Sequence, residues 1–209
     1  MLKRKIRTLI MPKILKNFWY VNEGRPQSDL IFNSADFVRF SQIDKILDEV
    51  KFLGGDVIEL GVYRGRLSQL IADKIKNTDK RYILVDTFNG FKPTEVANDV
   101  EKGYISGKIE DFSNTSVDIV LDKIANVGLP LKRVELREGY FPNSLISSDS
   151  SRNFCFASVD FDLSLPTAEA LEYLWPRMVK GGYIVVHDYG NNKYSGVSFA
   201  VYKFIKENN

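Results

Sequence analysis

The stretch that decides the fold is Asp56-Val57-Ile58-Glu59-Leu60-Gly61-Val62-Tyr63-Arg64-Gly65. Its first half is short and mostly apolar, with a carboxylate near its end, which is typical of a buried strand. Two glycines follow, and a helical pattern begins at Leu67. A strand that runs through a glycine turn into a helix is the unit that builds nucleoside-binding crevices in open α/β sheets. The stretch therefore predicts an α/β sheet with a ligand site at this turn.

The spacing of the glycines restricts the ligand. The dinucleotide fingerprint G-x-G-x-x-G uses its second glycine to let the backbone approach a pyrophosphate. Tyr63 occupies that position here, so only Gly61 and Gly65 remain. The turn favours a ligand that has a nucleoside and no pyrophosphate, and S-adenosylmethionine is the common ligand of that kind. An ordinary strand-to-helix turn without a ligand is the alternative.

The composition is that of an ordinary globular chain with one domain. The 209 residues are 44% hydrophobic and 27% charged, and the net charge is +2. A domain of this length buries roughly 70% of the surface that its unfolded chain exposes. The small net charge argues against nucleic acid as a partner. Cys155 is the only cysteine, which excludes a disulfide framework or a cysteine-based zinc site and suits a reducing, cytoplasmic location.

The N-terminal residues differ from the rest in charge. Six basic side chains fall within the first sixteen residues, at Lys3, Arg4, Lys5, Arg7, Lys13 and Lys16. No apolar run in the chain is long enough for a membrane span, and the N-terminal one is too short for a signal peptide. We expect residues 1–35 to be a basic arm or helical appendage, ahead of one domain over 36–209. The arm could contact a membrane surface weakly or contact a partner subunit, and a solvated terminus is the alternative.

Strand and helix patterns alternate along the domain. Strands are predicted at 56–60, 81–85, 134–137, 154–159 and 183–186, and helices at 41–52, 67–75, 116–127, 166–178 and 197–207. We expect Gly181-Gly182 to stop the helix over 166–178, and residues 89–111, which show no clear period, to form a mobile loop. Alternation of this kind predicts a doubly wound, mainly parallel sheet with right-handed crossovers.

Acidic residues mark the ends of several predicted strands. Glu59, Asp160 and Asp188 each lie at or just after such an end, and Asp86 follows the second strand. Ligands of open parallel sheets bind outside the carboxyl ends of the strands, so Glu59, Asp160 and Asp188 should converge on one edge. A carboxylate in the place of Asp86 accepts hydrogen bonds from ribose hydroxyls. The alternative for Asp86 is a local turn with Thr87.

The densest group of such residues is Asp160-Phe161-Asp162 together with His187-Asp188. Three carboxylates and an imidazole at one edge repel or compete unless a cation joins them. Oxygen ligands suit magnesium, calcium or manganese, and an imidazole shifts the preference toward manganese or later metals. A bound ion could lower the pKa of a hydroxyl, and a spare carboxylate could take its proton. The alternative is that Asp162 and Asp188 cap local structure and that His187 is an ordinary polar residue.

Four segments resemble the macrocin O-methyltransferase (TylF-type) family. They are VIELGVYRG (57–65), LVDTFNGF (84–91), GYFPNSL (139–145) and SVDFDLSLPTAEALEYLWPRMVKGGYIVVHDYG (158–190). They occur in the family's order, and the resemblance covers about 39–204. It implies the Rossmann-like fold of class I methyltransferases. It also implies transfer of a methyl group from S-adenosylmethionine to a hydroxyl of a sugar or glycoconjugate, assisted by a divalent ion such as Mg²⁺ or Mn²⁺.

The resemblance also assigns roles to residues. The cofactor contacts that we expect are Glu59, Gly61, Tyr63, Gly65, Asp86, Thr87, Phe88, Gly139, Tyr140 and Asp160. Asp160 inherits the role of a metal ligand, and Asp162 that of a candidate catalytic base. His187 and Asp188 match the paired acids that complete the metal site, and we expect His187 to act as a ligand or in catalysis.

Two departures from the family pattern affect these expectations. The family has two acids where this chain has His187 and then Asp188, which leaves the choice between magnesium and manganese open. Class I methyltransferases continue into a strand hairpin, whereas this chain stops at Asn209. Without the hairpin the strand at 183–186 has an open edge, so we expect a homo-oligomer that covers it, and a shortened form of the sequence is the alternative. The alternative functions are methylation of a catechol or phenol, and a subunit that binds the cofactor without catalysis.

Overall fold

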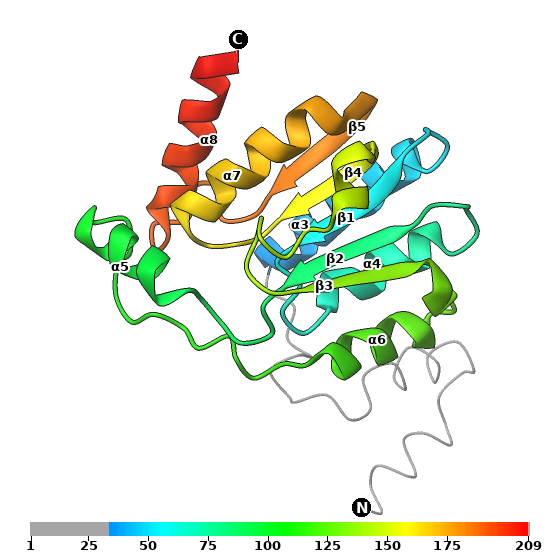
Figure 1. The fold of residues 1–209 in the computed structure, drawn as a ribbon, viewed down its shortest axis with the longest axis horizontal. Coiled ribbons are helices and arrows are strands. Elements are labelled where there is room, and N and C mark those ends of the chain that lie inside the picture. Colours follow the sequence, from blue (N-terminus) through cyan, green and yellow to red (C-terminus); the bar gives the residue numbers. More distant parts are fainter. Residues whose placement is uncertain (1–33, 209) are drawn as a thin grey trace, which may run out of the picture. The chain divides into compact units, whose positions relative to one another are not determined.

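The computed structural model describes residues 34–208 (Figure 1). The chain divides into two compact units, residues 1–42 and 43–209. Of the first unit the structure describes only the opening residues of helix α3 (Ser34–Val50). Apart from its last two residues, the basic arm predicted at 1–35 lies outside the described residues, and the domain boundary at 35 stays a prediction.

A five-stranded sheet forms the centre of the second unit, and all of its strand pairs are parallel (Figure 1). The strands are β1 (Asp56–Leu60), β2 (Tyr82–Asp86), β3 (Val134–Glu138), β4 (Phe154–Val159) and β5 (Met178–Val186). Their order in the sheet is β3-β2-β1-β4-β5. The chain therefore winds outward from β1 in one direction and from β4 in the other. The predicted doubly wound, parallel α/β sheet is confirmed.

Helices cover both faces of this sheet. The helices that follow α3 are α4 (Arg66–Ile75), α5 (Pro93–Glu101), α6 (Val117–Asn126), α7 (Ser164–Leu174) and α8 (Ser195–Asn208), with short 3-10 helices at Leu131–Arg133, Ser147–Ser151 and Trp175–Arg177. One apolar cluster joins α4, α6 and the residues of α3 from Ile43 onward to the sheet. A second cluster joins α7 to the opposite face, and α8 packs against α7. Because both faces are covered, β1 and β4 are buried almost without interruption.

The order of the strands reverses between β1 and β4, which places a topological switch point at their carboxyl ends. Ligands of doubly wound sheets bind in the crevice at such a point. The glycine turn after β1 and the acids after β4 both lie there. The fold thus brings together the two segments that the sequence singled out.

The segment 89–111 contains a helix, so the prediction of a loop throughout is wrong at this point. Helix α5 has Pro93 in its first turn, where a proline loses no hydrogen bond. Its sequence is largely polar, yet Glu95 and Asp99 are buried. Burial of these two residues comes from tertiary packing, which gives no period in the sequence.

The helix predicted over 166–178 ends earlier than expected. Helix α7 stops at Leu174, a 3-10 turn contains Pro176, and β5 already begins at Met178. Gly181-Gly182 lies inside β5 and stops no helix. A Cβ on Gly182 would meet the Cys155 carbonyl oxygen at 2.9 Å, so this glycine allows β5 to lie close to β4.

Within the described residues no strand follows β5, and the chain continues into α8. β5 therefore lies at one edge of the sheet, as expected for a sheet without the hairpin. Tyr183 on this strand is 40% exposed. A homo-oligomer that covers the edge stays a prediction.

Candidate active site

The parallel hydrogen-bond ladder continues one residue beyond the strands and so fixes the spacing of their ends. The Asp160 N–H donates to the Leu60 carbonyl at 2.8 Å, and the His187 N–H donates to the Val159 carbonyl at 2.8 Å. The first residue after β4 is held against the end of β1, and the first residue after β5 against the end of β4. This pairing sets Asp160 and His187 side by side.

Gly61 makes the approach of the β1 turn to β4 possible. Its φ of +85° is a backbone conformation that favours glycine. A Cβ at this position would lie 2.0 Å from the Asp160 carbonyl oxygen. No other residue fits there without moving one of the two strand ends. Gly61 therefore serves close packing of the site as well as the shape of the turn.

Asp86 fastens the glycine turn by its carboxylate. Oδ2 accepts the backbone N–H groups of Val62 at 2.6 Å and Tyr63 at 2.8 Å, and Oδ1 accepts that of Phe88 at 2.7 Å. A carboxylate offers about four lone-pair sites. With three backbone donors bound, one site is left for a ligand hydroxyl. The position agrees with a ribose contact, and the role of Asp86 in cofactor binding stays a prediction.

Glu59 has a buried carboxyl group that faces α4 and β2. It is 1% exposed, and its Oε2 accepts hydrogen bonds from Ser68 Oγ at 2.7 Å and from the Tyr82 hydroxyl. Burial raises the pKa of Glu59 to about 8. The side chain thus ties the end of β1 to α4 and to β2. A contact of Glu59 with the cofactor stays a prediction, and its backbone is the part nearest to the turn.

The other residues expected at the cofactor lie in the turns after β2 and β3. Thr87 Oγ1 donates to the Gly90 carbonyl at 2.7 Å and so closes the turn after β2. The Gly139 N–H donates to the Asp86 carbonyl at 2.9 Å, which ties the turn of Gly139 and Tyr140 to the same place. Tyr140 is half-buried. These turns lie at the carboxyl ends of β2 and β3, and their contacts with a cofactor stay predictions.

Backbone strain gathers at this edge of the sheet. Within the described residues, the non-glycine residues with positive φ are Tyr63, Phe88, Asp162 and Asp188, at 50°, 51°, 58° and 59°. One follows each of the strands β1, β2, β4 and β5. Such conformations cost on the order of 1–3 kcal/mol each and collect at functional sites. The strain therefore marks the same edge as the acids, from an independent observation.

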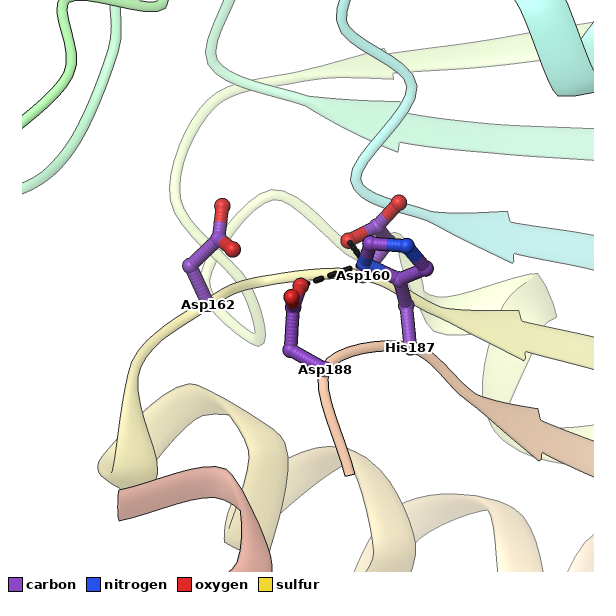
Figure 2. Close-up of side chains that lie close together, drawn as sticks. All are labelled: Asp160, Asp162, His187 and Asp188. Carbon is purple, nitrogen blue, oxygen red and sulfur yellow. Dashed lines mark hydrogen bonds and ion pairs between the residues drawn. The ribbon is translucent and has the colours of Figure 1, made fainter. Parts of the chain in front are cut away.

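Asp160, Asp162, His187 and Asp188 converge as predicted (Figure 2). One ligand atom from each lies within 4.8 Å of the others. His187 Nδ1 lies 2.8 Å from Asp160 Oδ1 and also forms a hydrogen bond with Asp188 Oδ2. Asp162 stands to one side of these three (Figure 2). The other oxygen of Asp188 accepts the Asn191 amide at 2.5 Å.

The cluster divides its charges unevenly. Burial, followed by the nearby Asp160 and Asp188, raises the pKa of Asp162 to about 9. Burial alone would lower the pKa of His187, but hydrogen bonds with Asp160 and Asp188 outweigh it and raise that pKa to about 10. Burial acts against ionisation of Asp188 as well, yet its hydrogen bonds, first with His187, hold its pKa below the usual value. An imidazolium between two carboxylates and a neutral Asp162 is the state favoured by the chain itself.

The donor set of the cluster fits a divalent cation. Carboxylate oxygens from two neighbouring strand ends and one imidazole nitrogen lie within 4.8 Å of one another. Hard cations take such oxygens, and manganese also accepts imidazole. A cation there would replace the proton that His187 shares with the carboxylates.

Some residues of this site give only weak signals in the sequence. Asn191 holds Asp188, the Tyr63 hydroxyl donates to Asn114 Oδ1 at 2.6 Å, and Thr115 donates to the Tyr63 carbonyl. Asn191 lies in a polar run after His187-Asp188 that suggested only a loop. Asn114 and Thr115 lie far along the chain from the turn that they hold, so no local pattern connects them to it.

Comparison with known proteins agrees with this geometry. The family model for macrocin O-methyltransferase (TylF) matches residues 34–209 of the chain. The chain belongs to this family. As a TylF-family protein, it is an S-adenosylmethionine-dependent O-methyltransferase. The resemblance predicted from the four sequence segments is confirmed.

Individual relatives are more distant. A Streptomyces olivaceus enzyme, 8-demethyl-8-(2,3-dimethoxy-alpha-L-rhamnosyl)-tetracenomycin-C 4'-O-methyltransferase, is 25% identical, and the match covers 86% of this chain and 78% of that enzyme. The structure of the calicheamicin methyltransferase CalS11 matches with a TM-score of 0.68 and 20% identity, over 92% of this chain and 84% of that one. The O-methyltransferase NovP matches with a TM-score of 0.63 and 21% identity, over 81% and 71%. These two structures show that this TylF-family chain shares their fold.

Proposed function

We propose that this TylF-family chain methylates a hydroxyl group of a sugar or glycoconjugate with the help of a divalent cation. The observation that carries the proposal is the position of the acid cluster. Asp160 and Asp162 follow β4, which lies directly beside β1 and its glycine turn. A donor held at the turn and an acceptor held at the cluster would meet at the topological switch point.

The residues of the β1–β2 side would hold the donor. The turn from Gly61 to Gly65 is kept open by glycine and fixed by Asp86, which has one acceptor site left for a ribose hydroxyl. Transfer of a methyl group is an in-line displacement, so the rate depends mainly on how donor and acceptor are placed. A rigid turn serves that purpose.

The residues of the β4–β5 side would hold and activate the acceptor. A sugar hydroxyl is a poor nucleophile while it carries its proton. In the proposed step the hydroxyl gives this proton to Asp162 as its oxygen takes the methyl group, and S-adenosylhomocysteine leaves. Asp162 can accept the proton only when it is ionised, and its raised pKa works against that state in the chain alone.

A bound divalent cation would remove this conflict between the raised pKa of Asp162 and its role as a base. Asp160, His187 and Asp188 would hold it, and when bound it would lower the pKa of the acceptor hydroxyl and of neighbouring acids. Binding of the ion requires a neutral imidazole, so His187 would release its proton. Asp162, at the side of the cluster, would remain available as the base.

The proposal of a sugar as acceptor is supported by relatives. The Streptomyces olivaceus relative is named for a rhamnosyl-tetracenomycin, and CalS11 is described as a TDP-rhamnose 3'-O-methyltransferase. Methylation of a catechol or phenol by the same groups is the second candidate. Half-buried Phe88, Phe91 and Phe112 would suit either kind of ring.

The test is transfer of a labelled methyl group to a panel of nucleotide sugars, glycosides, catechols and phenols. We expect turnover with sugars, loss of turnover after chelation and loss in Asp162→Asn. Turnover with phenols alone would replace the sugar by the second candidate. Binding of S-adenosylhomocysteine without turnover on any acceptor would support a catalytically silent subunit.

The remaining expectations concern the setting of the enzyme. None of the described helices is both long and apolar enough to cross a bilayer. We propose a cytoplasmic homo-oligomer with a small-molecule or glycan substrate and no nucleic acid. Weak contact of the basic residues at 1–35 with a membrane surface falls almost entirely outside the described residues and stays a prediction.

A further inference from the structure

Asp99 is a buried carboxyl group outside the acid cluster. It lies on α5 and is 1% exposed. Its Oδ2 accepts the backbone N–H of Ser164 at 2.7 Å, and its Oδ1 accepts the hydroxyl of the same residue. Ser164 is the first residue of α7. A carboxylate at this place satisfies a free N–H and interacts favourably with the helix dipole.

The start of α8 packs against the same group. A Cβ on Gly196 would lie 3.1 Å from Asp99 Oδ2, 2.9 Å from Ser164 Cβ and 3.0 Å from the ring of Tyr104. The Tyr104 carbonyl accepts the Ser195 N–H at 3.0 Å. The segment of α5 and the first turns of α7 and α8 thus meet at one point (Figure 1). We call Asp99, Tyr104, Ser164 and Gly196 the three-helix junction.

The junction anchors the turn that carries Asp162. That turn begins at Asp160, which is bonded to the end of β1, and ends at Ser164, which is bonded to Asp99. Between them Asp162 adopts a φ of +58°, and the Leu163 N–H donates to the Phe161 carbonyl at 2.7 Å. A strained residue persists only where its surroundings over-determine it. Asp99 supplies one of the two fixed ends.

The junction also anchors the loop that carries His187 and Asp188. This loop leads into α8, and Tyr194 near its end forms an antiparallel bridge with Ile105. The Ser106 N–H donates to the Lys193 carbonyl at 3.0 Å. The residues just after α5 therefore hold the end of this loop, and Asp99 lies close to Gly196 in the helix that follows it.

We propose that Asp99 is a positioning residue for methyl transfer. It bonds to none of the four acid-cluster side chains. It is bonded to the end of the segment that carries Asp162, and it lies against Gly196 in the helix that follows His187 and Asp188. The proposal rests on the proposed function, in which Asp162 takes a proton and Asp188 holds a cation. A displacement of about 1 Å at such groups can cost about 100-fold in rate. A residue that only stabilises the fold would lower the unfolding temperature and leave the rate of the folded enzyme unchanged.

Asp149 is a buried aspartate that provides a matched control ahead of the amino-terminal end of β4. It is 0% exposed, accepts the Ile146 N–H at 2.9 Å and pairs with Arg137 at 2.9 Å. It precedes β4, whereas the acid cluster follows β4. Loss of either carboxylate should destabilise the fold, but only loss of Asp99 should disturb the cluster.

The experiment compares kcat and the affinity for S-adenosylhomocysteine in Asp99→Ala, Asp99→Asn and Asp149→Ala. In Asp99→Ala we expect kcat to fall about 10- to 100-fold while the calorimetric Kd stays within about two-fold, because the cofactor turn is held separately by Asp86. Asp99→Asn should recover most of the rate, since its amide oxygen can accept the Ser164 N–H and its amide can donate to the Ser164 hydroxyl. Asp149→Ala should melt earlier and keep its kcat at temperatures where it is folded. Ser164→Ala, which removes one of the two bonds to Asp99, replaces Asp99→Ala if that variant fails to fold.

Hydrogen exchange separates failure of this inference from failure of the proposed function. In Asp99→Ala the amides of Leu163 and Asn191 should exchange faster, while those of Val62 and Tyr63 should not change. This measurement needs no acceptor, so it decides the point even if the wild type methylates nothing in the panel. Unchanged protection at Leu163 and Asn191, or an equal fall of kcat in the Asp99 and Asp149 variants, would overturn the proposal.

Discussion

The β1–β2 side and the β4–β5 side of the candidate site, its two halves, hold their carboxyl groups in different ways. On the β1–β2 side Asp86 accepts three backbone N–H groups, so its charge is matched by fixed dipoles of the chain. On the β4–β5 side three carboxyl groups gather around one imidazole. The first half is complete without a ligand, whereas the second depends on protons or on a cation. We therefore expect the first half to determine cofactor affinity and the second to determine rate.

The strongest test of this comparison is the substitution Asp162→Asn. The amide cannot take the proton of the acceptor, so kcat should fall by about 10²- to 10⁴-fold, the usual range for a general base. The Kd for S-adenosylhomocysteine, measured by calorimetry, should stay within about two-fold because the cofactor turn is untouched. Asp122→Asn, which changes an exposed aspartate on α6, is the control. A similar kcat in the two variants would remove Asp162 from the chemistry.

Removal of divalent cations should have the next largest effect. Charge stabilisation by such an ion is worth several kcal/mol, so exhaustive chelation should reduce turnover by about 100-fold or more. Re-addition of manganese should restore turnover at least as well as magnesium, because His187 offers a nitrogen ligand. Full turnover after chelation would contradict the metal role.

The substitution His187→Asp sharpens the same point. An aspartate at this position supplies oxygen in place of nitrogen, and the preference should move toward magnesium. The measurement is the ratio of turnover with the two metals in wild type and variant. Equal ratios in both would show that His187 does not bind the ion.

The sequence predicted which residues lie together better than it predicted the contacts that hold them in place. Convergence of Asp160 and Asp188 follows from one rule, that the carboxyl ends of parallel strands lie together. The same rule predicts that Glu59 joins them, but its buried carboxyl group bonds to Ser68 and Tyr82 instead. The support comes from tertiary contacts that leave no local pattern. Asp99 reaches Ser164 across 65 positions of the chain, and Asn114 reaches Tyr63 across 51.

The sequence pattern was misleading at a pair of glycines, and it gave no sign of an unusual backbone conformation at two bulky residues. Gly181-Gly182 follows a helical pattern and so resembles a helix stop, but the close approach of β5 to β4 requires glycine inside the strand. Tyr63 and Phe88 give no sign of positive φ, since large side chains avoid it. Their backbone N–H groups are drawn to Asp86, and these bonds impose the conformation.

Replacement of Asp86 tests the half of the crevice that is held by backbone dipoles. Asp86→Ala removes the acceptor of three N–H groups and the site left for a ribose hydroxyl. We expect cofactor affinity to weaken by about 1–3 kcal/mol, the usual cost of stranded hydrogen-bond partners. Asp56→Ala, at the opposite end of β1, should leave calorimetric affinity unchanged. Equal affinities in Asp86→Ala and wild type would exclude Asp86 from cofactor binding.

Glu59 is an exception on the β1–β2 side, because no backbone N–H groups of the described residues surround its carboxyl group as they surround that of Asp86. Its buried carboxyl accepts hydrogen bonds from Ser68 and Tyr82, yet burial raises its pKa to about 8. Because the folded-state pKa lies above the ordinary glutamate value of 4.5, the folded state holds a proton that the unfolded state has lost at intermediate pH. The stability that goes with this proton is present at low pH and is lost as pH rises toward 8.

Glu59→Gln should remove this pH dependence, since glutamine keeps the acceptor oxygen and does not titrate. From pH 6 to pH 7 the unfolding free energy of the wild type should fall relative to the variant by up to about 1.4 kcal/mol, the value of one proton per pH unit. Denaturant unfolding of both proteins at the two pH values measures the difference, in which other titrating groups largely cancel. A constant difference would mean that Glu59 is already ionised in the folded protein. In that case the two donors at Oε2 would stabilise the charge of Glu59 as the backbone N–H groups stabilise that of Asp86. Both carboxylates of the β1–β2 side would then be held by hydrogen bonds in the ionised state.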